Sequence, residues 1–204
     1  MIKAEISAIF PTPIYKNKLD RKFTTKELHF VEKIKTKSIE NTGNRISIDK
    51  YVLNDPSFAT LKKEIDLFIG DYFSKILVPS KPVFPYITQS WLNYTEINEY
   101  HPIHRHPNAY LSGVLYINAD KSHDKITFDP NRYDQIKLST TKPNLFNSNS
   151  WFFPVETGEV MIFPASLMHL VEKKKGKNTR ISLSFNVFVK GNIGEAYDLT
   201  ELKL

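Results

Sequence analysis

The chain contains no cysteine among its 204 residues. This absence excludes disulfide bonds, zinc–thiolate sites, iron–sulfur clusters and thiol nucleophiles, so any metal must be bound by histidine and carboxylate side chains. The chain also lacks an apolar run of the roughly 18 residues that a membrane span needs. Its first residues, MIKAEISAIFPTPIY, do not have the pattern of a secretory signal peptide. We therefore expect a cytoplasmic protein that does not associate with membranes.

Composition narrows the class of protein further. The chain is 41% hydrophobic and 13% aromatic, which is enough for one good core, and a single domain is the default at this length. Its 14 phenylalanines and 10 tyrosines favour a sheet-rich core over a helical bundle. A net charge of +6 indicates a nucleic-acid partner, an acidic substrate or neither. The densest basic run is interpreted as a solvated hairpin loop: Lys173, Lys174, Lys175 and Lys177.

The first third of the chain has helical periodicity after one extended segment. Ile6–Tyr15 contains a Pro-Thr-Pro break and is predicted to be an edge strand or an extended arm, through which two chains of a homodimer would pair. Two amphipathic helices are predicted, over Thr25–Lys37 and over 56–76, the second with Asp55 as N-cap and Pro56 at its first position. Their apolar faces are predicted from spacings of three and four: Leu28, Val31 and Ile34, then Phe58, Leu61, Ile65, Phe68 and Tyr72.

Beyond Pro79, short runs of β-branched and aromatic residues alternate with turn-forming residues. Eight strands are predicted: Tyr86–Tyr94, Leu111–Asn118, Lys125–Phe128, Ile136–Leu138, Ser150–Val155, Glu159–Phe163, Met168–Glu172 and Arg180–Val189. This pattern favours a sandwich, jelly roll or small barrel with helices on one face. We predict a mainly β fold with supporting α, a double-stranded β-helix (jelly roll, cupin-like) preceded by two helices. The single domain spans 1–204, with 1–80 as helical support and 81–190 as the jelly-roll core.

Three of the six histidines lie in the stretch HPIHRHPN. Alternate residues of a strand face the same side, so His104 and His106 can point to one site, whereas His101 points elsewhere unless a bend intervenes. His169 opens a later strand, and strands distant in sequence meet inside a jelly roll. Two close ligands and one distant ligand form a three-point site with open positions, which suits iron(II).

Arg180 follows His169 with ten residues between them. After a hairpin it is expected to lie beside the metal on an antiparallel strand, where its planar fork suits a carboxylate. Ser182 shares its strand parity and can add a hydroxyl donor. An arginine buried in a small barrel needs an anion, and its sequence neighbours supply none. The alternatives are an internal ion pair or a surface arginine.

The pattern H-x-H…H-x₁₀-R-x-S on short strands resembles the 2-oxoglutarate- and iron(II)-dependent oxygenase superfamily. More narrowly, the chain is similar to a family of bacteria and their phages known as "putative 2OG-Fe(II) oxygenase". The resemblance covers the chain from Phe10 to Val189. It is carried by FPTPIY near the start, SWLN at Ser90–Asn93, HRHPNAYLSGVLYI at His104–Ile117, FDPNR at Phe128–Arg132, TGEVMIFPASLMHLV at Thr157–Val171 and TRISLSFNV at Thr179–Val187.

The resemblance implies a role for each matched residue. His104 matches the first iron ligand and His169 the distal ligand. Arg180 matches the residue that binds the far carboxylate of 2-oxoglutarate, with Ser182 assisting. Asn93 matches a position where related enzymes often place a polar contact to the cosubstrate.

One position departs from the superfamily pattern. Position 106 is His where the superfamily has Asp or Glu. Either iron is bound by the three imidazoles of His104, His106 and His169, or a carboxylate comes from elsewhere. The candidates for that carboxylate are Glu99, Asp120 and Asp129.

The resemblance implies an oxidoreductase, a dioxygenase that uses Fe(II), 2-oxoglutarate and molecular oxygen, and acts as a hydroxylase on a small-molecule or peptide substrate. The alternatives are a three-histidine cupin-type metal enzyme that does not use 2-oxoglutarate, a non-catalytic module that binds nucleic acid, and a structural jelly roll. Nucleic acid is the less favoured partner. The residues expected at the mouth of the site are Tyr110, Trp91, Trp151 and Arg132.

Overall fold

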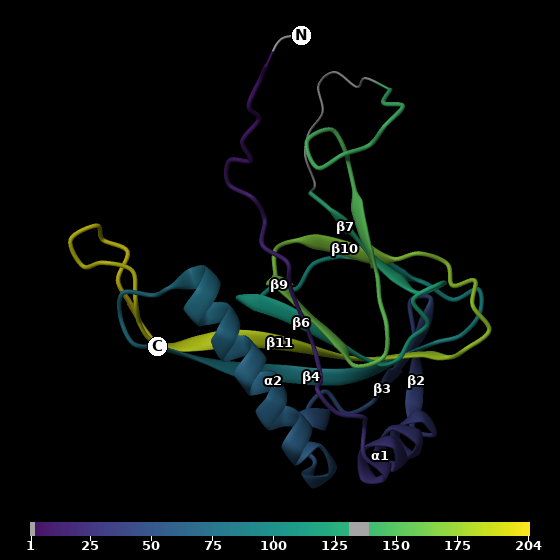
Figure 1. Cartoon of the computed structure of the whole chain (residues 1–204). Helices are drawn as coiled ribbons and strands as arrows, with labels where there is room; N and C mark the ends of the chain where they lie inside the picture. Colours follow the sequence, from purple (N-terminus) through teal and green to yellow (C-terminus); the bar gives the residue numbers. More distant parts are fainter. Residues whose placement is uncertain (1–2, 131–138) are drawn as a thin grey trace.

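The computed structural model describes residues 3–130 and 139–204, and it confirms a mainly β jelly roll preceded by two helices (Figure 1). The helical elements are α1 (Thr25–Lys35), the 3₁₀ turns η1 (Val52–Asn54) and η2 (Pro56–Phe58), α2 (Ala59–Tyr72) and the π turn η3 (Phe73–Leu77). The strands are β1 (Tyr15–Lys18), β2 (Ser38–Asn41), β3 (Asn44–Ser47), β4 (Val83–Thr95), β5 (His101–His104), β6 (Leu111–Asn118), β7 (Lys125–Asp129), β8 (Trp151–Pro154), β9 (Glu159–Pro164), β10 (Met168–Val171), β11 (Arg180–Ile193) and β12 (Leu202–Lys203).

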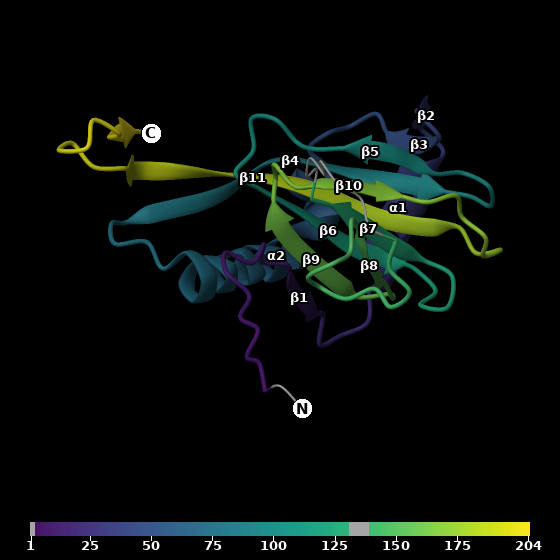
Figure 2. The same ribbon diagram turned by 90° about the horizontal axis from the view of Figure 1, so that it is seen from above.

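The strands form two antiparallel sheets. The larger sheet has the order β1-β9-β6-β11-β4-β3-β2, with β12 paired to β11. The smaller sheet has the order β5-β10-β7-β8. Seen from above, β4 and β11 run side by side along the molecule and extend beyond the neighbouring strands (Figure 2). These two long strands therefore contribute residues to both the hydrophobic core and the site.

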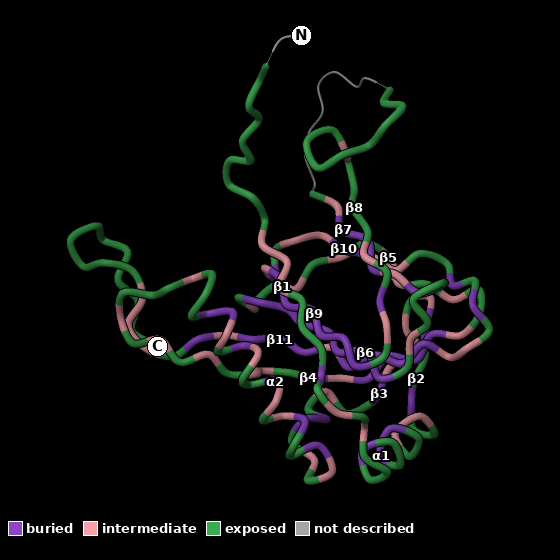
Figure 3. The backbone as a smooth tube through the Cα atoms, in the orientation of Figure 1, coloured by how far each residue is buried: buried purple, intermediate pink, exposed green. Residues whose placement is uncertain are grey.

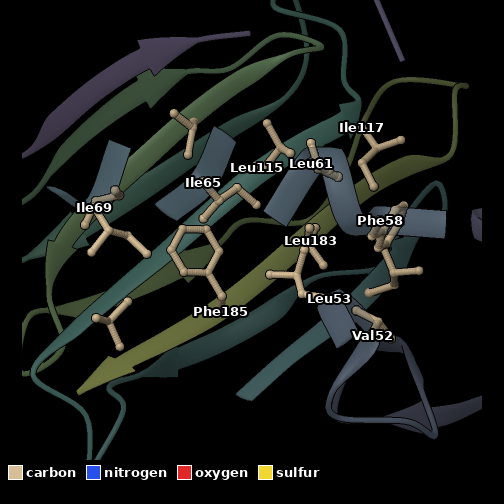
Figure 4. Close-up of a cluster of buried hydrophobic side chains, with 14 of the residues drawn as sticks. Val52, Leu53, Phe58, Leu61, Ile65, Ile69, Leu115, Ile117, Leu183 and Phe185 are labelled. Carbon is tan, nitrogen blue, oxygen red and sulfur yellow. The ribbon is translucent and has the colours of Figure 1, made fainter. Parts of the chain in front are cut away.

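Strand alternation divides the larger sheet into two faces. One face of β6 and β11 packs against α2, and Leu115, Leu183 and Phe185 contact the helix residues Leu61 and Ile65 in one buried cluster (Figure 4). The other face meets the smaller sheet in a second apolar cluster, made of Val114, Tyr116, Ile126, Phe128, Val155, Met161 and Phe163. Strands β6, β9 and β11 are therefore buried on both faces along most of their length, unlike the chain ends (Figure 3).

Gly113 is required by close packing within this sheet. It is the register partner of Phe185, and a Cβ at Gly113 would lie 2.1 Å from Phe185 Cζ. A side chain at position 113 would displace a ring that is fully buried in the main core.

The two helices form where the sequence predicted them, but α1 buries a different face. Its buried residues are Glu27, Phe30 and Val31, whereas Leu28, which was expected to be buried, is 43% exposed. The buried carboxylate is neutralised by Arg21, whose Nη1 and Nη2 donate to Glu27 at 2.8 and 2.7 Å. The apolar spacing could not anticipate this, because a buried Glu carries no apolar signal.

The second helical segment follows its prediction closely. The Asp55 side chain accepts a hydrogen bond from the backbone N–H of Ser57 at 2.8 Å, and Pro56 takes the first position, although the first turn is 3₁₀. Phe58, Leu61, Ile65 and Tyr72 are buried as expected.

The amino-terminal segment is an arm rather than a strand. Its only ladder begins at Tyr15, where β1 pairs with β9. Ile6, Ile9 and Phe10 are exposed, at 73%, 73% and 94% (Figure 3). Pairing between two chains through this arm stays a prediction.

The basic run at 173–177 was expected to be a solvated loop, but one of its lysines is not exposed to solvent. Lys173 and Lys175 are exposed, but Lys174 is buried. Its Nζ lies 3.6 Å from Asp124 Oδ1 and donates hydrogen bonds to Gly176 O and Asn178 Oδ1, both at 2.8 Å. Lys174 is therefore a structural residue that holds the β10–β11 hairpin.

Strands β2, β3, β5 and β12 were not predicted, and the predicted strand Ile136–Leu138 lies outside the described residues. None of the helices in the described ranges is long and apolar enough to cross a membrane.

Candidate metal and cosubstrate site

Three histidines from β5, the turn after it and β10 come together between the two sheets. One ring nitrogen each of His104, His106 and His169 lies within 4.8 Å of the others. His169 and His104 are register partners in the β5–β10 ladder. His106 lies beyond the end of β5, where its backbone N–H donates to Ala165 O at 2.9 Å. The structure thus brings together the three residues that the sequence proposed as ligands.

Backbone hydrogen bonds set the orientation of two of these rings. His104 Nδ1 lies 2.8 Å from Pro102 O, and His169 Nδ1 lies 3.0 Å from Leu167 O. Because a carbonyl oxygen only accepts, each Nδ1 must carry the proton, which leaves Nε2 with a free lone pair. A metal-binding imidazole commonly donates its other N–H in this way.

The third ring is oriented by side chains. His106 hydrogen-bonds to Asn186, whose Oδ1 also accepts from Ser112 Oγ at 3.2 Å. The ring of His106 also stacks with those of Trp91 and His169, at centroid distances of 5.7 and 5.2 Å. His106 therefore has both a hydrogen-bond partner and aromatic contacts that fix its plane.

His169 is buried and His104 and His106 are half-buried, which favours the neutral form of all three imidazoles. Burial lowers the pKa of His106 to about 4 and that of His169 to about 3, and the charges of neighbouring histidines lower both further. Burial also lowers the pKa of His104, against a hydrogen bond to Pro102 that raises it. The neutral imidazole is the form that binds a metal ion, so these rings are ready for a metal at neutral pH.

His101 does not point away from the site, as its parity had suggested. In the β5–β10 ladder, His104 pairs with His169 and His101 pairs with Val171, so residues 101–104 of β5 lie opposite 169–171 of β10, with one residue more on β5. This extra residue is a β-bulge, and a bulge reverses the alternation of side chains. His101 consequently lines the same cavity, with its ring centroid 4.4 Å from that of His104.

The proposed cosubstrate residues line this cavity too. Arg180 lies on β11 at the deep end, and Ser182 follows two residues later on the same face. Asn93 pairs with Ser182 across the ladder, and its Nδ2 donates to Ser184 Oγ at 3.0 Å. Arg180, Ser182 and Asn93 are all buried, at 5%, 3% and 7% exposure.

Arg180 is buried without a counter-ion. Within residues 3–130 and 139–204, no carboxylate lies within ion-pair distance of it, and its only hydrogen bond runs from Nη1 to Lys125 O at 3.3 Å. Its Nε is buried without a partner. Burial lowers the pKa of Arg180 below its ordinary value, while the nearby Tyr116 and Asp124 raise it. A buried guanidinium in this state is stabilised when an anion binds to it.

The alternative carboxylate ligands do not join the histidine cluster. The group of potential metal ligands found among the described residues contains three imidazoles and no carboxylate. Glu99 accepts a hydrogen bond from the backbone of Glu96, and Asp120 accepts two from Ser122. Asp129 ends β7 opposite Met168 and is not part of the cluster.

Several cavity residues were missed, although the sequence carried a signal for them. Ser184 is one of them: it alternates with apolar residues in the motif RISLSFN and so shares one face of β11 with the predicted Arg180 and Ser182. Of the residues expected at the mouth, Trp91 lines the cavity. Tyr110 instead packs on Phe73 on the helical side, Trp151 is not among the lining residues, and Arg132 lies outside the described residues.

Together the fold and the site define a class: a double-stranded β-helix with a cluster of three histidines and a buried arginine in one cavity. Residues 89–186, which contain all six proposed site residues, match the family described as "Putative 2OG-Fe(II) oxygenase". Over these residues the chain is similar to that family, whose description names iron(II) and 2-oxoglutarate. No curated protein matches the chain in sequence.

Three solved structures have a similar fold. An oxidoreductase of the 2OG-Fe(II) oxygenase family from Burkholderia pseudomallei is 14% identical, with 84% of this chain and 83% of that chain covered and a TM-score of 0.53. HygX from Streptomyces hygroscopicus, with nickel, 2-oxoglutarate and hygromycin B bound, is 12% identical, with 86% and 82% covered and a TM-score of 0.58. SnoN, a non-heme alpha-ketoglutarate-dependent epimerase from nogalamycin biosynthesis, is 12% identical, with 87% and 78% covered and a TM-score of 0.58. At these identities the likeness is one of fold.

Proposed function

We propose that this chain is an iron(II)- and 2-oxoglutarate-dependent oxygenase whose metal is held by His104, His106 and His169. One observation carries the proposal. The cavity that gathers three metal-competent imidazoles also contains the buried Arg180, which has no acidic partner in the part of the chain that the structure describes. A metal ion and a dicarboxylate together satisfy both sets of groups.

The residues fit the metal in number and in protonation state. Neutral imidazole suits first-row metals, and three protein ligands leave coordination positions open. A set of three histidines carries one more unit of positive charge than two histidines and a carboxylate. A doubly anionic cosubstrate offsets that difference, which makes tight binding of an anion at this site more favourable.

The residues around Arg180 fit the cosubstrate. The guanidinium can bind a carboxylate through two parallel hydrogen bonds, and the Ser182 hydroxyl can donate a third. Asn93 is held by Ser184, so its position is fixed before a ligand arrives. These contacts would hold the far end of a five-carbon 2-oxo dicarboxylate while its 2-oxo acid end reaches the metal.

When bound, the metal and 2-oxoglutarate supply oxidative chemistry in which O₂ is consumed, 2-oxoglutarate becomes succinate and CO₂, and a substrate is oxidised. The protein holds the reactants in register and excludes water from the buried cavity. We propose hydroxylation as the outcome, on a small molecule or a peptide. The likeness to two family enzymes that are crystallised with 2-oxoglutarate or named for its use supports this class of reaction.

The test is an anaerobic titration of the iron(II)-loaded protein with 2-oxoglutarate, followed by visible absorption. We expect the weak charge-transfer band of the chelate in the native protein and no band with glutarate, which lacks the 2-oxo group. His169→Ala should bind neither iron nor cosubstrate. If iron binds but no band forms, the chain is instead a three-histidine metal enzyme that does not use 2-oxoglutarate.

A further inference from the structure

Three buried polar atoms in or beside the cavity have no hydrogen-bond partner. They are Arg180 Nε, His101 Nδ1 and Thr95 Oγ1. Thr95 and Arg180 are register partners on β4 and β11, and His101 lines the cavity with Arg180 from the opposite sheet. A buried polar group without a partner is unfavourable, so the two such atoms that belong to cavity-lining residues, Arg180 Nε and His101 Nδ1, indicate a missing ligand.

His101 differs from the proposed metal ligands in one respect. His104 and His169 each use Nδ1 to donate to a backbone carbonyl oxygen. His101 has no such bond at Nδ1, and it does not belong to the group of three nitrogens that could hold a metal. Its Nδ1 is therefore available to a ligand, whereas the corresponding atoms of the other two rings are occupied.

The fold places His101 in this position by a specific device. The bulge in β5 turns its ring into the cavity, where regular alternation would turn it away. Bulges are common next to binding sites because they redirect one side chain. The bulge thus places an imidazole and a guanidinium in one cavity that has no acidic partner for Arg180 in the described ranges.

We propose that His101 is a binding residue for the far carboxylate of the 2-oxo dicarboxylate cosubstrate, with Nδ1–H donating to one oxygen of the carboxylate that the Arg180 fork also binds. This inference rests on the proposed function. A carboxylate offers about four lone-pair sites, and the fork of one arginine occupies about two of them, so a further donor is needed in a dry cavity. His101 acts on the far carboxylate, and the 2-oxo acid end is left to the metal.

The experiment compares two cosubstrates on the nickel-loaded protein by calorimetry. 2-Oxoglutarate has the far carboxylate, and 2-oxopentanoate has the same chain length without it. His101→Phe keeps a flat ring but removes the N–H. We expect it to weaken 2-oxoglutarate binding by about tenfold to a hundredfold, the usual loss for a hydrogen bond to a charged group. Binding of 2-oxopentanoate and of nickel should stay unchanged.

Two further variants sharpen the comparison. The amide nitrogen of Asn can take the place of Nδ1, so His101→Asn should keep 2-oxoglutarate affinity within about threefold of the native protein. His29→Phe makes the same replacement on the exposed side of α1 and should change nothing.

The outcomes separate this inference from the proposed function. Equal losses for both cosubstrates, or loss of nickel binding in both His101 variants, would overturn it, because His101 would then support the metal ligands instead. Unchanged 2-oxoglutarate affinity in His101→Phe would also overturn it while leaving the proposed function intact. Failure of the native nickel-loaded protein to bind 2-oxoglutarate would overturn both.

Discussion

Trp91 and His106 are stacked, with ring centroids 5.7 Å apart and planes inclined by 24°. Trp91 comes from β4 in the larger sheet, whereas His106 follows β5 of the smaller sheet, so the contact joins the two sheets at the metal site. Asn186 on β11 is a further partner of His106 and forms a hydrogen bond with it. A histidine at a position where the superfamily has a short carboxylate is thus held by groups that suit an imidazole.

Replacing Asn186 should leave His106 less well oriented and so weaken metal binding. Asn186→Ala removes the hydrogen bond that orients the ring, and loss of such a partner commonly weakens metal binding by about tenfold to a hundredfold. We expect this increase in the nickel dissociation constant, measured by competition with a chromophoric chelator. Asn186→Asp, which keeps an acceptor, should bind nickel at least as tightly as the native protein.

The matched control lies on the same strand. Asn192 is six residues along β11 and donates to Glu201 at 2.9 Å, away from the cavity. Asn192→Ala should leave nickel affinity unchanged. Equal nickel affinities in Asn186→Ala and the native protein would show that stacking alone orients His106.

Arg180 should separate cosubstrate binding from metal binding. Arg180→Ala removes the buried cation and should weaken 2-oxoglutarate binding by at least about a hundredfold, because a charge-assisted pair is lost. Arg180→Lys keeps the charge but not the planar fork. Its affinity for 2-oxoglutarate should lie between those of the native protein and Arg180→Ala. Nickel binding should be retained in both, measured by calorimetry.

The control is Arg105→Lys, which alters an exposed arginine between two proposed ligands. It should leave 2-oxoglutarate affinity within about twofold. If Arg180→Ala bound 2-oxoglutarate as tightly as the native protein, the carboxylate would have to bind elsewhere in the cavity.

The sequence predicted most of the fold because its signals are periodic. Alternation over Leu111–Asn118 and Arg180–Val189 and the three-four spacing after Asp55 need no knowledge of the rest of the chain. Strands β2, β3 and β5 have only four residues each, too few for a clear pattern. The predicted buried face of α1 was partly wrong, because Glu27 is buried through an ion pair with Arg21, which lies outside the helix.

For the site, the sequence predicted residues but not the contacts that arise from register. The H-x-H and R-x-S spacings placed His104, His106, Arg180 and Ser182 in one cavity. The inward turn of His101 depends on a bulge that shows only when β5 is aligned with β10. Such pairing is set by the whole sheet, not by local sequence.

Lys174 should be more important for stability than its neighbours in the basic run. It forms a buried pair with Asp124, and removal of one partner from such a pair typically costs about 3–5 kcal/mol. We expect Lys174→Ala to lower the free energy of unfolding by this amount, measured by urea denaturation. Lys173→Ala, on the exposed neighbour, should stay within about 0.5 kcal/mol of the native protein. Similar stabilities for the two variants would contradict a structural role for Lys174.

The Arg21–Glu27 pair should make stability depend on pH. Burial alone would raise the pKa of Glu27, but hydrogen bonds from Arg21 and Thr24 outweigh it and hold the pKa below the ordinary value of 4.5. A carboxylate whose pKa is lower in the folded state contributes stability above about pH 4.5, and this contribution is lost as pH falls through the folded pKa. Glu27→Gln keeps the shape of the side chain and removes its charge. We expect it to lower the free energy of unfolding by about 1–3 kcal/mol at pH 7.

The difference between the native protein and Glu27→Gln should shrink as the pH falls below 4.5, because the native carboxylate then becomes neutral as well. Urea denaturation at pH 7 and at about pH 3.5 measures both values. Glu32→Gln, on the exposed side of the same helix, should show little loss at either pH. A deficit in Glu27→Gln that is equal at both pH values would mean that the amide disrupts packing around α1, and that the charge of Glu27 contributes nothing.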